Sequence, residues 1–391
     1  MPGFEWFGDE ERAEVGEVLE TGVLFRYGFD GPRRGRWKAR EFEKELAARL
    51  GASHCHAVSS GTAALSTALA ACGIGPGDEV IVPPFTFVAT VEAVLQAGAV
   101  PVFADIDETL CLAPEAAAAA HTRKTRAVVP VHMCGGMARI EALADLCAAE
   151  GTILIEDACQ AIGGTVKGRA LGTFGRAGCF SFDYVKTITC GEGGAVVTDD
   201  PEVHRLADAY ADHGHDHLGA DRGADAHPIP GLNFRIGEMN AATGLAQLRK
   251  LDRILERQRA AKTFLKSAMA GLPGVSFREL PDPDGDSATF LSFLLPDEDR
   301  ARTAARELAA AGLDGCFYWY DNNWHYIRQW DHFAVPAWPP EHARRTGIRK
   351  PELPRSDAIM SRTLSLLIKL SWDDAELDRR AGILRRVLNK G

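Results

Sequence analysis

The stretch Ile153-Leu154-Ile155-Glu156-Asp157 combines a short apolar strand with two acids at its end. A helical stretch, Glu141 to Glu150, comes just before it. Helices that alternate with short buried strands are typical of a parallel sheet covered by helices. Ligands of such sheets bind at the carboxyl ends of the strands, where Asp157 is expected. Taken alone, the two acids are also compatible with the N-cap of a helix.

The same alternation continues on both sides of this stretch. Further short strands are predicted at 56–58, 79–82, 100–104, 127–132, 179–182 and 194–198. A long helix from Glu238 to Arg259 then leads away, and strands are expected at 287–295 and 315–320. The sequence therefore predicts an α/β protein. Its large domain, residues 1–250, has an N-terminal helix segment and a mixed, mostly parallel sheet, and a smaller α+β domain follows at 251–391.

Composition narrows the class of protein. The 391 residues are 46% hydrophobic and 25% charged, as in ordinary globular proteins, and the formal net charge is −10. An acidic chain is a poor partner for the phosphate backbone of nucleic acids. No apolar run is long enough to span a membrane, and the N-terminus lacks the apolar core of a signal peptide. The nine cysteines form no CxxC pair, which indicates reduced thiols in a cytoplasmic protein.

A second candidate site is the turn Ser59-Ser60-Gly61-Thr62-Ala63, between a strand and a helix. Free amides at the start of a helix bind anions, and glycine lets a ligand approach the backbone closely. The turn therefore suits a phosphate group, although serine and threonine also cap helices in general. A carboxylate such as Asp157 can keep a pyridine nitrogen protonated, which makes the ring an electron sink. The two sites together indicate an anionic, aromatic cofactor.

The third candidate is Lys186, which ends Ser181-Phe182-Asp183-Tyr184-Val185-Lys186 and precedes the glycine-rich turn 191–194. A lysine after a short strand can point inward at a cofactor. A buried lysine amine that has lost its charge is a nucleophile. A lone lysine is usually a solvated surface group, so a functional role for Lys186 depends on its neighbours.

Four motifs occur in order along residues 15–255: Ser59–Leu65, Glu156–Ala161, Ser181-Phe182 with Lys186, and Gly231-Leu232-Asn233-Phe234-Arg235. Their combination resembles the DegT/DnrJ/StrS family of sugar aminotransferases, with a looser match beyond residue 255. The resemblance implies the aspartate-aminotransferase-like fold (fold type I) of enzymes that use pyridoxal phosphate (PLP). It also implies a homodimer with active sites shared at the subunit interface.

The resemblance implies a role for each matching residue. Lys186 is expected to bind the cofactor covalently and Asp157 to pair with its ring nitrogen, as the catalytic residues. Gln160 is expected near the ring hydroxyl, Phe87 on the ring face, and Asn233 at the phosphate from the neighbouring subunit. The other phosphate contacts are expected from Ser60, Gly61, Thr62 and Ser181. Relatives with histidine in place of this lysine are dehydratases, so Lys186 favours amine transfer.

Finer features at 26–27, 212–223 and 315–325 resemble family members that aminate C8 of 8-oxo-3,8-dideoxy-manno-octulosonate, a lipopolysaccharide sugar acid. Glutamate is the expected amino donor, and the segment 334–354 departs from the resemblance. A free sugar acid requires a cation for its carboxylate and suits an aromatic wall. The candidate substrate contacts are Arg26, Tyr27, His213, His215, Arg235, Tyr318 and Trp319. The aromatic run at 315–325 is equally compatible with a core strand.

Other interpretations remain open at this point. An aminotransferase for a nucleotide-linked keto sugar or a cyclitol would carry the same motifs, and a non-catalytic PLP-binding regulator would bind the cofactor without reacting with glutamate. In the polar loop 213–230, His213, His215 and His217 alternate, so on a strand they would share one face and suit a metal. The same loop is also compatible with contact to the substrate or with a structural, hydrogen-bonded role. No metal is expected, because PLP chemistry requires none.

Overall fold

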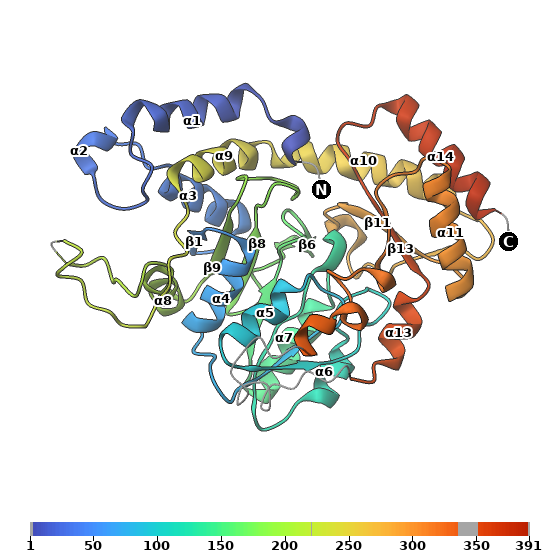
Figure 1. Cartoon of the computed structure of the whole chain (residues 1–391), viewed down its shortest axis with the longest axis horizontal. Helices are drawn as coiled ribbons and strands as arrows, with labels where there is room; N and C mark the ends of the chain where they lie inside the picture. The colour runs from blue at the N-terminus through green and yellow to red at the C-terminus, as the bar shows by residue number, and fades with distance from the viewer. Residues whose placement is uncertain (1–2, 220, 335–350, 390–391) are drawn as a thin grey trace.

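Two sheets form the framework of the protein (Figure 1). The computed structural model describes residues 3–219, 221–334 and 351–389, so most of the segment 334–354 lies outside the described residues. The larger sheet has seven strands in the order β1-β9-β8-β5-β4-β2-β3. The smaller sheet has four strands in the order β10-β11-β13-β12.

The larger sheet is mixed and mostly parallel. Its neighbouring strands from β8 to β3 pair in parallel, whereas β9 runs antiparallel to both β8 and β1. The strands are β1 (His54–Val58), β2 (Glu79–Val82), β3 (Val100–Phe103), β4 (Thr125–Val128), β5 (Ile153–Asp157), β8 (Ala177–Ser181) and β9 (Gly194–Thr198). This arrangement confirms the predicted α/β fold. A short hairpin, β6 (Thr165–Val166) and β7 (Arg169–Ala170), follows β5.

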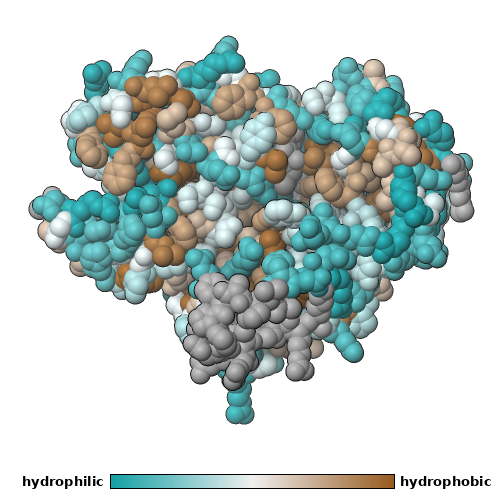
Figure 2. Space-filling view, in the orientation of Figure 1, coloured by the Kyte–Doolittle hydropathy of each residue, from teal (hydrophilic) through white to brown (hydrophobic). Residues whose placement is uncertain are grey.

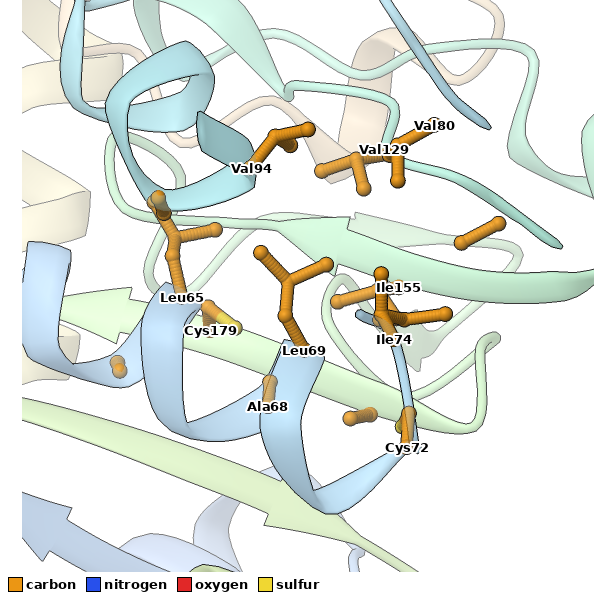
Figure 3. Close-up of a cluster of buried hydrophobic side chains, with 14 of the residues drawn as sticks. Leu65, Ala68, Leu69, Cys72, Ile74, Val80, Val94, Val129, Ile155 and Cys179 are labelled. Atoms are coloured by element: carbon orange, nitrogen blue, oxygen red, sulfur yellow. The ribbon is translucent and has the colours of Figure 1, made fainter. Parts of the chain in front are cut away.

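Helices cover both faces of this sheet. One face packs against α4 (Gly61–Ala71), α5 (Ala89–Gln96) and α8 (Pro201–Ala211). The other packs against α3 (Lys38–Leu50), α7 (Ile140–Glu150) and α9 (Glu238–Arg249), with α6 (Pro114–Ala120) beside α7. In Figure 3, Leu65 and Leu69 of α4 lie against the sheet near Val129 and Ile155, in one buried cluster. Burial on both faces explains why the strands read as continuous apolar runs.

The smaller sheet is antiparallel and lies in the C-terminal part of the chain. Its strands are β10 (Ser276–Phe277), β11 (Phe290–Leu294), β12 (Cys316–Tyr318) and β13 (Thr363–Leu367). A buried apolar cluster joins this sheet to α10 (Leu251–Met269), α11 (Glu298–Ala310) and α14 (Asp374–Leu388). The remaining α-helices of the described residues are α1 (Asp9–Thr21), α2 (Asp30–Arg33) and α13 (Pro354–Met360). A domain boundary near residue 250 stays a prediction.

Two predicted elements differ in detail. The single helix expected from Glu238 to Arg259 is two helices, because Lys250 interrupts it and α10 then continues to Met269. The buried Lys250 ammonium donates to both oxygens of Glu11, which ties this break to α1. The strand expected at 315–320 ends at Tyr318 and continues as a 3-10 turn. Within the described residues, no helix has the length and apolar character needed to cross a membrane.

Candidate active site

A cavity of about 380 Å³ lies where β1, β5 and β8 end and α4 begins. Its lining includes every predicted cofactor residue except Asn233, namely Ser60, Gly61, Thr62, Phe87, Asp157, Gln160, Ser181 and Lys186. The first and last of these residues, Ser60 and Lys186, are more than 120 positions apart in the chain. The sheet brings them together because the carboxyl ends of parallel strands meet at one edge.

One end of the cavity suits an anion. The side chain of Ser60 caps α4 by accepting a hydrogen bond from the amide of Ala63 at 3.0 Å. Gly61 and Thr62 open the helix, where amides have no acceptor within the helix. A Cβ on Gly61 would lie 2.6 Å from the Cβ of Ser181, so only glycine fits this approach. Capping and anion binding are thus compatible here, and the hydroxyls of Thr62 and Ser181 border the same space.

Asp157 also lines the cavity and is 3% exposed. Its Oδ2 accepts from the hydroxyl of Thr90 at 2.7 Å, and its Oδ1 accepts from the amide of Cys159 at 3.1 Å. Turns follow Asp157, so it caps no helix. Burial, reinforced by the charge of Asp157, raises the pKa of the Cys159 thiol well above its ordinary value, so this cavity cysteine stays protonated at neutral pH.

Glu156 points to the other side of β5, because neighbouring residues in a strand face opposite ways. Its carboxylate accepts from the amides of Gly172 at 2.8 Å and Gly175 at 2.7 Å. His132 also contacts it through Nε2 at 3.0 Å, while the Nδ1 of the same ring accepts from the amide of Ala138. Of the two acids in the motif, only Asp157 therefore faces the cavity.

Gln160 and Phe87 form other parts of the lining. The Oε1 of Gln160 accepts from the amide of Cys134 at 3.0 Å, which fixes the side-chain amide with its NH₂ group left for another acceptor. Phe87 presents a partly buried ring, and Trp324 stacks on that ring at 5.8 Å between centroids with an interplanar angle of 12°. The lining thus offers a hydrogen-bond donor and an aromatic face.

Lys186 is 9% exposed, so it is not a solvated surface lysine. It follows β8 on a turn closed by its own amide donating to the carbonyl of Asp183 at 3.1 Å. Its Nζ lies 3.8 Å from the Asp183 carboxylate. Burial, together with the charge of Lys186, lowers the pKa of the nearby His325 to about 3, so this imidazole is neutral at physiological pH. The amine therefore has one partner carboxylate and an open cavity before it.

The candidate substrate residues near the N-terminus lie outside this cavity. Arg26 is buried and donates to Glu43 at 2.6 Å. The hydroxyl of Tyr27 donates to Asp208 at 2.7 Å, and its ring stacks on His217 at 4.0 Å. Burial raises the pKa of Tyr27. Both side chains therefore belong to a polar network beside α8 in this subunit.

The loop after α8 also lies outside the cavity and projects from one end of the molecule (Figure 1). Arg222 donates to both oxygens of the buried Asp212, at 2.7 and 2.9 Å, and Arg235 donates to the same carboxylate. His215 lies 3.2 Å from Asp225, and His213 is exposed. Among the described residues, no group of three or more histidines, cysteines or acids is placed to hold a metal.

Asn233 is exposed on an extended segment that bridges to Asp212. In the smaller sheet, Trp319 is buried and stacks on Phe317 at 4.7 Å, and the hydroxyl of Tyr318 donates to the carbonyl of Ser361. Trp319, on the 3-10 turn after β12, is therefore a core residue, whereas Tyr318 is only half-buried. Substrate contact by either residue stays a prediction.

The sequence did not single out Thr86 or Thr90, although both line the cavity. Thr90 contacts Asp157 directly, and the hydroxyls of Thr86 and Thr90 lie 2.6 Å apart. Thr86 precedes α5, which begins at Ala89, so no helical spacing links the two threonines and the sequence alone offered no signal for the pair.

The DegT/DnrJ/EryC1/StrS aminotransferase family model matches residues 7–385. The chain belongs to this family. It is 36% identical over 378 residues to the spore coat polysaccharide biosynthesis protein SpsC of Bacillus subtilis, which covers 95% of this chain and 92% of SpsC. The crystal structure of 3-amino-5-hydroxybenzoic acid synthase superposes with a TM-score of 0.82 at 34% identity, covering 98% and 97% of the two chains.

Aminotransferases of this family use PLP as their cofactor. NtdA of Bacillus subtilis, solved with bound pyridoxamine phosphate, superposes with a TM-score of 0.83 at 25% identity over 100% of this chain and 84% of that one. The cavity fits this group, because an anion cradle around Gly61, an aromatic face at Phe87 and a buried carboxylate at Asp157 surround one lysine amine.

Proposed function

We propose that this aminotransferase converts 8-oxo-3,8-dideoxy-manno-octulosonate to its 8-amino sugar, with glutamate as donor, in lipopolysaccharide sugar biosynthesis. The observation that carries the amine transfer is the buried Lys186 facing the cavity that Asp157 and Gly61 border. The sugar rests on the resemblance at 26–27, 212–223 and 315–325. Because the family is one of aminotransferases, the alternative of a non-catalytic regulator is dropped.

The roles of the residues follow from their positions. PLP, when bound, supplies an electron sink for the carbon that loses its proton. Lys186 would hold the cofactor through its Nζ, and the same amine, when free, would move a proton to and from the reacting carbon. Such general acid–base transfer contributes about 10²–10⁴-fold to a rate. Asp157 is proposed to hold a proton on the ring nitrogen and Gln160 to donate to the ring hydroxyl. Their hydrogen bonds with Thr90 and Cys134, which orient the two side chains, support these roles.

The cofactor's phosphate is expected to rest on the start of α4, against Ser60, Gly61, Thr62 and Ser181. We propose that Asn233 completes this site from a second copy of the chain, because it is exposed and lines no part of its own subunit's cavity. Figure 2 shows a hydrophobic patch over the α1–α2 end of the molecule, where Leu24 and Phe29 are exposed. Such a patch supports a homodimer.

A dimer also accounts for the candidate sugar contacts that lie away from the cavity. Arg235 and Asn233 are two residues apart on an extended segment, so their side chains share one face. Arg235 reaches Asp212 through Nη1 alone in the described contacts, which leaves the rest of its guanidinium for an anion. Arg26, Tyr27, His213 and His215 belong to the same end of the subunit and are proposed to act there. The cytoplasm is the expected compartment, since all nine cysteines are unpaired.

A second candidate substrate is a nucleotide-linked keto sugar or a cyclitol. The chain is similar to SpsC, named for polysaccharide biosynthesis, and to 3-amino-5-hydroxybenzoic acid synthase. These similarities favour testing amino acceptors other than the octulosonate. The test is a substrate panel with purified enzyme, PLP and glutamate. Amination of the 8-oxo sugar acid well above that of a nucleotide-linked 4-keto hexose supports the first proposal, and the reverse preference overturns it.

A further inference from the structure

Two threonines connect the aromatic face of the cavity to its carboxylate. Thr86 and Thr90 flank Phe87 in the chain and are both fully buried. The Oγ1 of Thr90 lies 2.7 Å from the Oδ2 of Asp157 and 2.6 Å from the Oγ1 of Thr86. The three side chains therefore form one continuous hydrogen-bonded row.

The direction of this row follows from proton counting. An ionised carboxylate only accepts, so the hydroxyl proton of Thr90 must lie on the bond to Asp157. Thr90 then has no proton for Thr86, and the short bond between the two hydroxyls requires the proton of Thr86. The row thus runs from Thr86 to Thr90 to Asp157. The Thr86 hydroxyl also lies 3.2 Å from the carbonyl of Phe87, a longer contact than its 2.6 Å contact with Thr90.

The start of the row is held by the backbone of another segment. The amide of Thr86 donates to the carbonyl of His325 at 3.0 Å, and the amide of Val88 donates to the carbonyl of Trp324 at 2.9 Å. These bonds fix residues 86–88 against a segment of the C-terminal half of the chain. Phe87 and the hydroxyl row are therefore positioned by one short stretch.

We propose that Thr90, supported by Thr86, is a positioning residue that orients the Asp157 carboxylate toward the cofactor's ring nitrogen and donates a hydrogen bond to it there. A donor to a carboxylate stabilises its charged form over its neutral form. With this donor present, the proton shared by Asp157 and the ring nitrogen stays on the nitrogen. The proposal rests on the role proposed above for Asp157, and it does not depend on which sugar the enzyme aminates.

The test compares Thr90→Val with Thr90→Ser, and Thr67→Val serves as the matched control. Valine keeps the shape of threonine and removes the hydroxyl, whereas serine keeps the hydroxyl. Thr67 is also fully buried, but its hydroxyl has no hydrogen-bond partner within the described part of the chain. The same substitution there removes a buried hydroxyl without touching Asp157. Thermal unfolding of each variant reports whether it folds.

The first readout is the pH titration of the visible absorbance of bound PLP, which needs no substrate. In Thr90→Val, less positive charge is expected on the pyridine ring of bound PLP. The nitrogen that joins PLP to Lys186 should then keep its proton to higher pH, so the midpoint of the absorbance titration should move to higher pH. Asp157→Asn is expected to move it in the same direction and further. Thr90→Ser and Thr67→Val are expected to titrate like the parent.

The second readout is the single-turnover reaction with glutamate alone. Its rate is expected to fall about tenfold to a hundredfold in Thr90→Val, the range for losing one hydrogen bond to a charged group, while the apparent Kd for PLP changes little. An unchanged midpoint in Thr90→Val, or equal losses in Thr90→Ser and Thr90→Val, overturns the proposal. Because neither readout uses a sugar, failure of the octulosonate assignment leaves both results interpretable.

Discussion

The cavity and the loop after α8 both concentrate polar side chains, yet they use them differently. In the cavity, Asp157 and Gln160 each bond to nearby backbone or hydroxyl groups and keep capacity toward the open space. In the loop, Arg222 and Arg235 both bond to the single buried carboxylate of Asp212. The first arrangement leaves hydrogen-bonding groups facing an open cavity, whereas the second ties the loop to the subunit through one carboxylate.

This difference predicts which measurement each region controls. Changes in the cavity are expected to alter cofactor binding and the reaction while the fold survives, because the strand ends that hold these residues are fixed by the sheet. Changes at Asp212 are expected to alter stability first, because a buried carboxylate with two cationic partners is strongly coupled to its surroundings.

The largest effect is expected from Lys186→Ala. Without this amine the cofactor cannot be held covalently and the proton carrier is lost, so turnover should fall by several orders of magnitude and the visible band of the lysine-linked cofactor should disappear. Lys167→Ala is the control, because that lysine is exposed and does not line the cavity. Retention of both the band and turnover in Lys186→Ala would refute the central role of this residue.

The next effect is expected from Gly61→Ala. The added Cβ would meet Ser181 at 2.6 Å and distort the anion cradle, so PLP affinity should weaken by about tenfold or more, as for a misplaced charge-assisted contact. Gly16→Ala on α1 is the matched control, since nothing lies within 4 Å of its Cβ position. That control should stabilise the helix by up to about 1 kcal/mol. Equal PLP affinity in the two variants would contradict the cradle.

In the loop, Asp212→Asn is expected to reduce the free energy of unfolding by about 1–3 kcal/mol, below the range for fully buried pairs because Arg222 is partly exposed. Urea unfolding measures this loss. Arg222→Gln should cost less, since Arg235 still pairs with the carboxylate. The midpoint of the pH titration of bound PLP should move much less in Asp212→Asn than in Asp157→Asn, because Asp212 does not line the cavity. Equal shifts in the two variants would contradict the distinction between the two regions.

The smallest effect is expected at Asp314, whose carboxylate is largely exposed although its partner Arg380 is buried. Lys369 and Arg380 lower the pKa of Asp314 to about 2. Its contribution to stability is therefore present above about pH 4, the unfolded value, and is lost as the pH falls toward 2. Asp314→Asn should remove this acid dependence and cost less than about 1 kcal/mol at pH 7, because the carboxylate is more than half exposed. If Asp314→Asn lowered the free energy of unfolding as much as Asp212→Asn, the exposure of the carboxylate would not determine its contribution to stability.

Local sequence determined much of the framework. The strands Glu79–Val82 and Gly194–Thr198 begin and end where their apolar runs do, and α3 stops at Gly51, which has the left-handed conformation that glycine favours. The break at Lys250 was not predictable, because it coincides with a salt bridge to Glu11, a residue 239 positions away.

The sequence by itself determined the α/β fold and the residue types of the site, because period, strand ends and helix starts are local properties. Only the tertiary structure decided that Asp157 and not Glu156 faces the cavity, that Thr86 and Thr90 donate toward it, and that Arg26 pairs with Glu43. Those outcomes depend on which side chains distant segments bring within hydrogen-bond distance, and no local pattern encodes that choice.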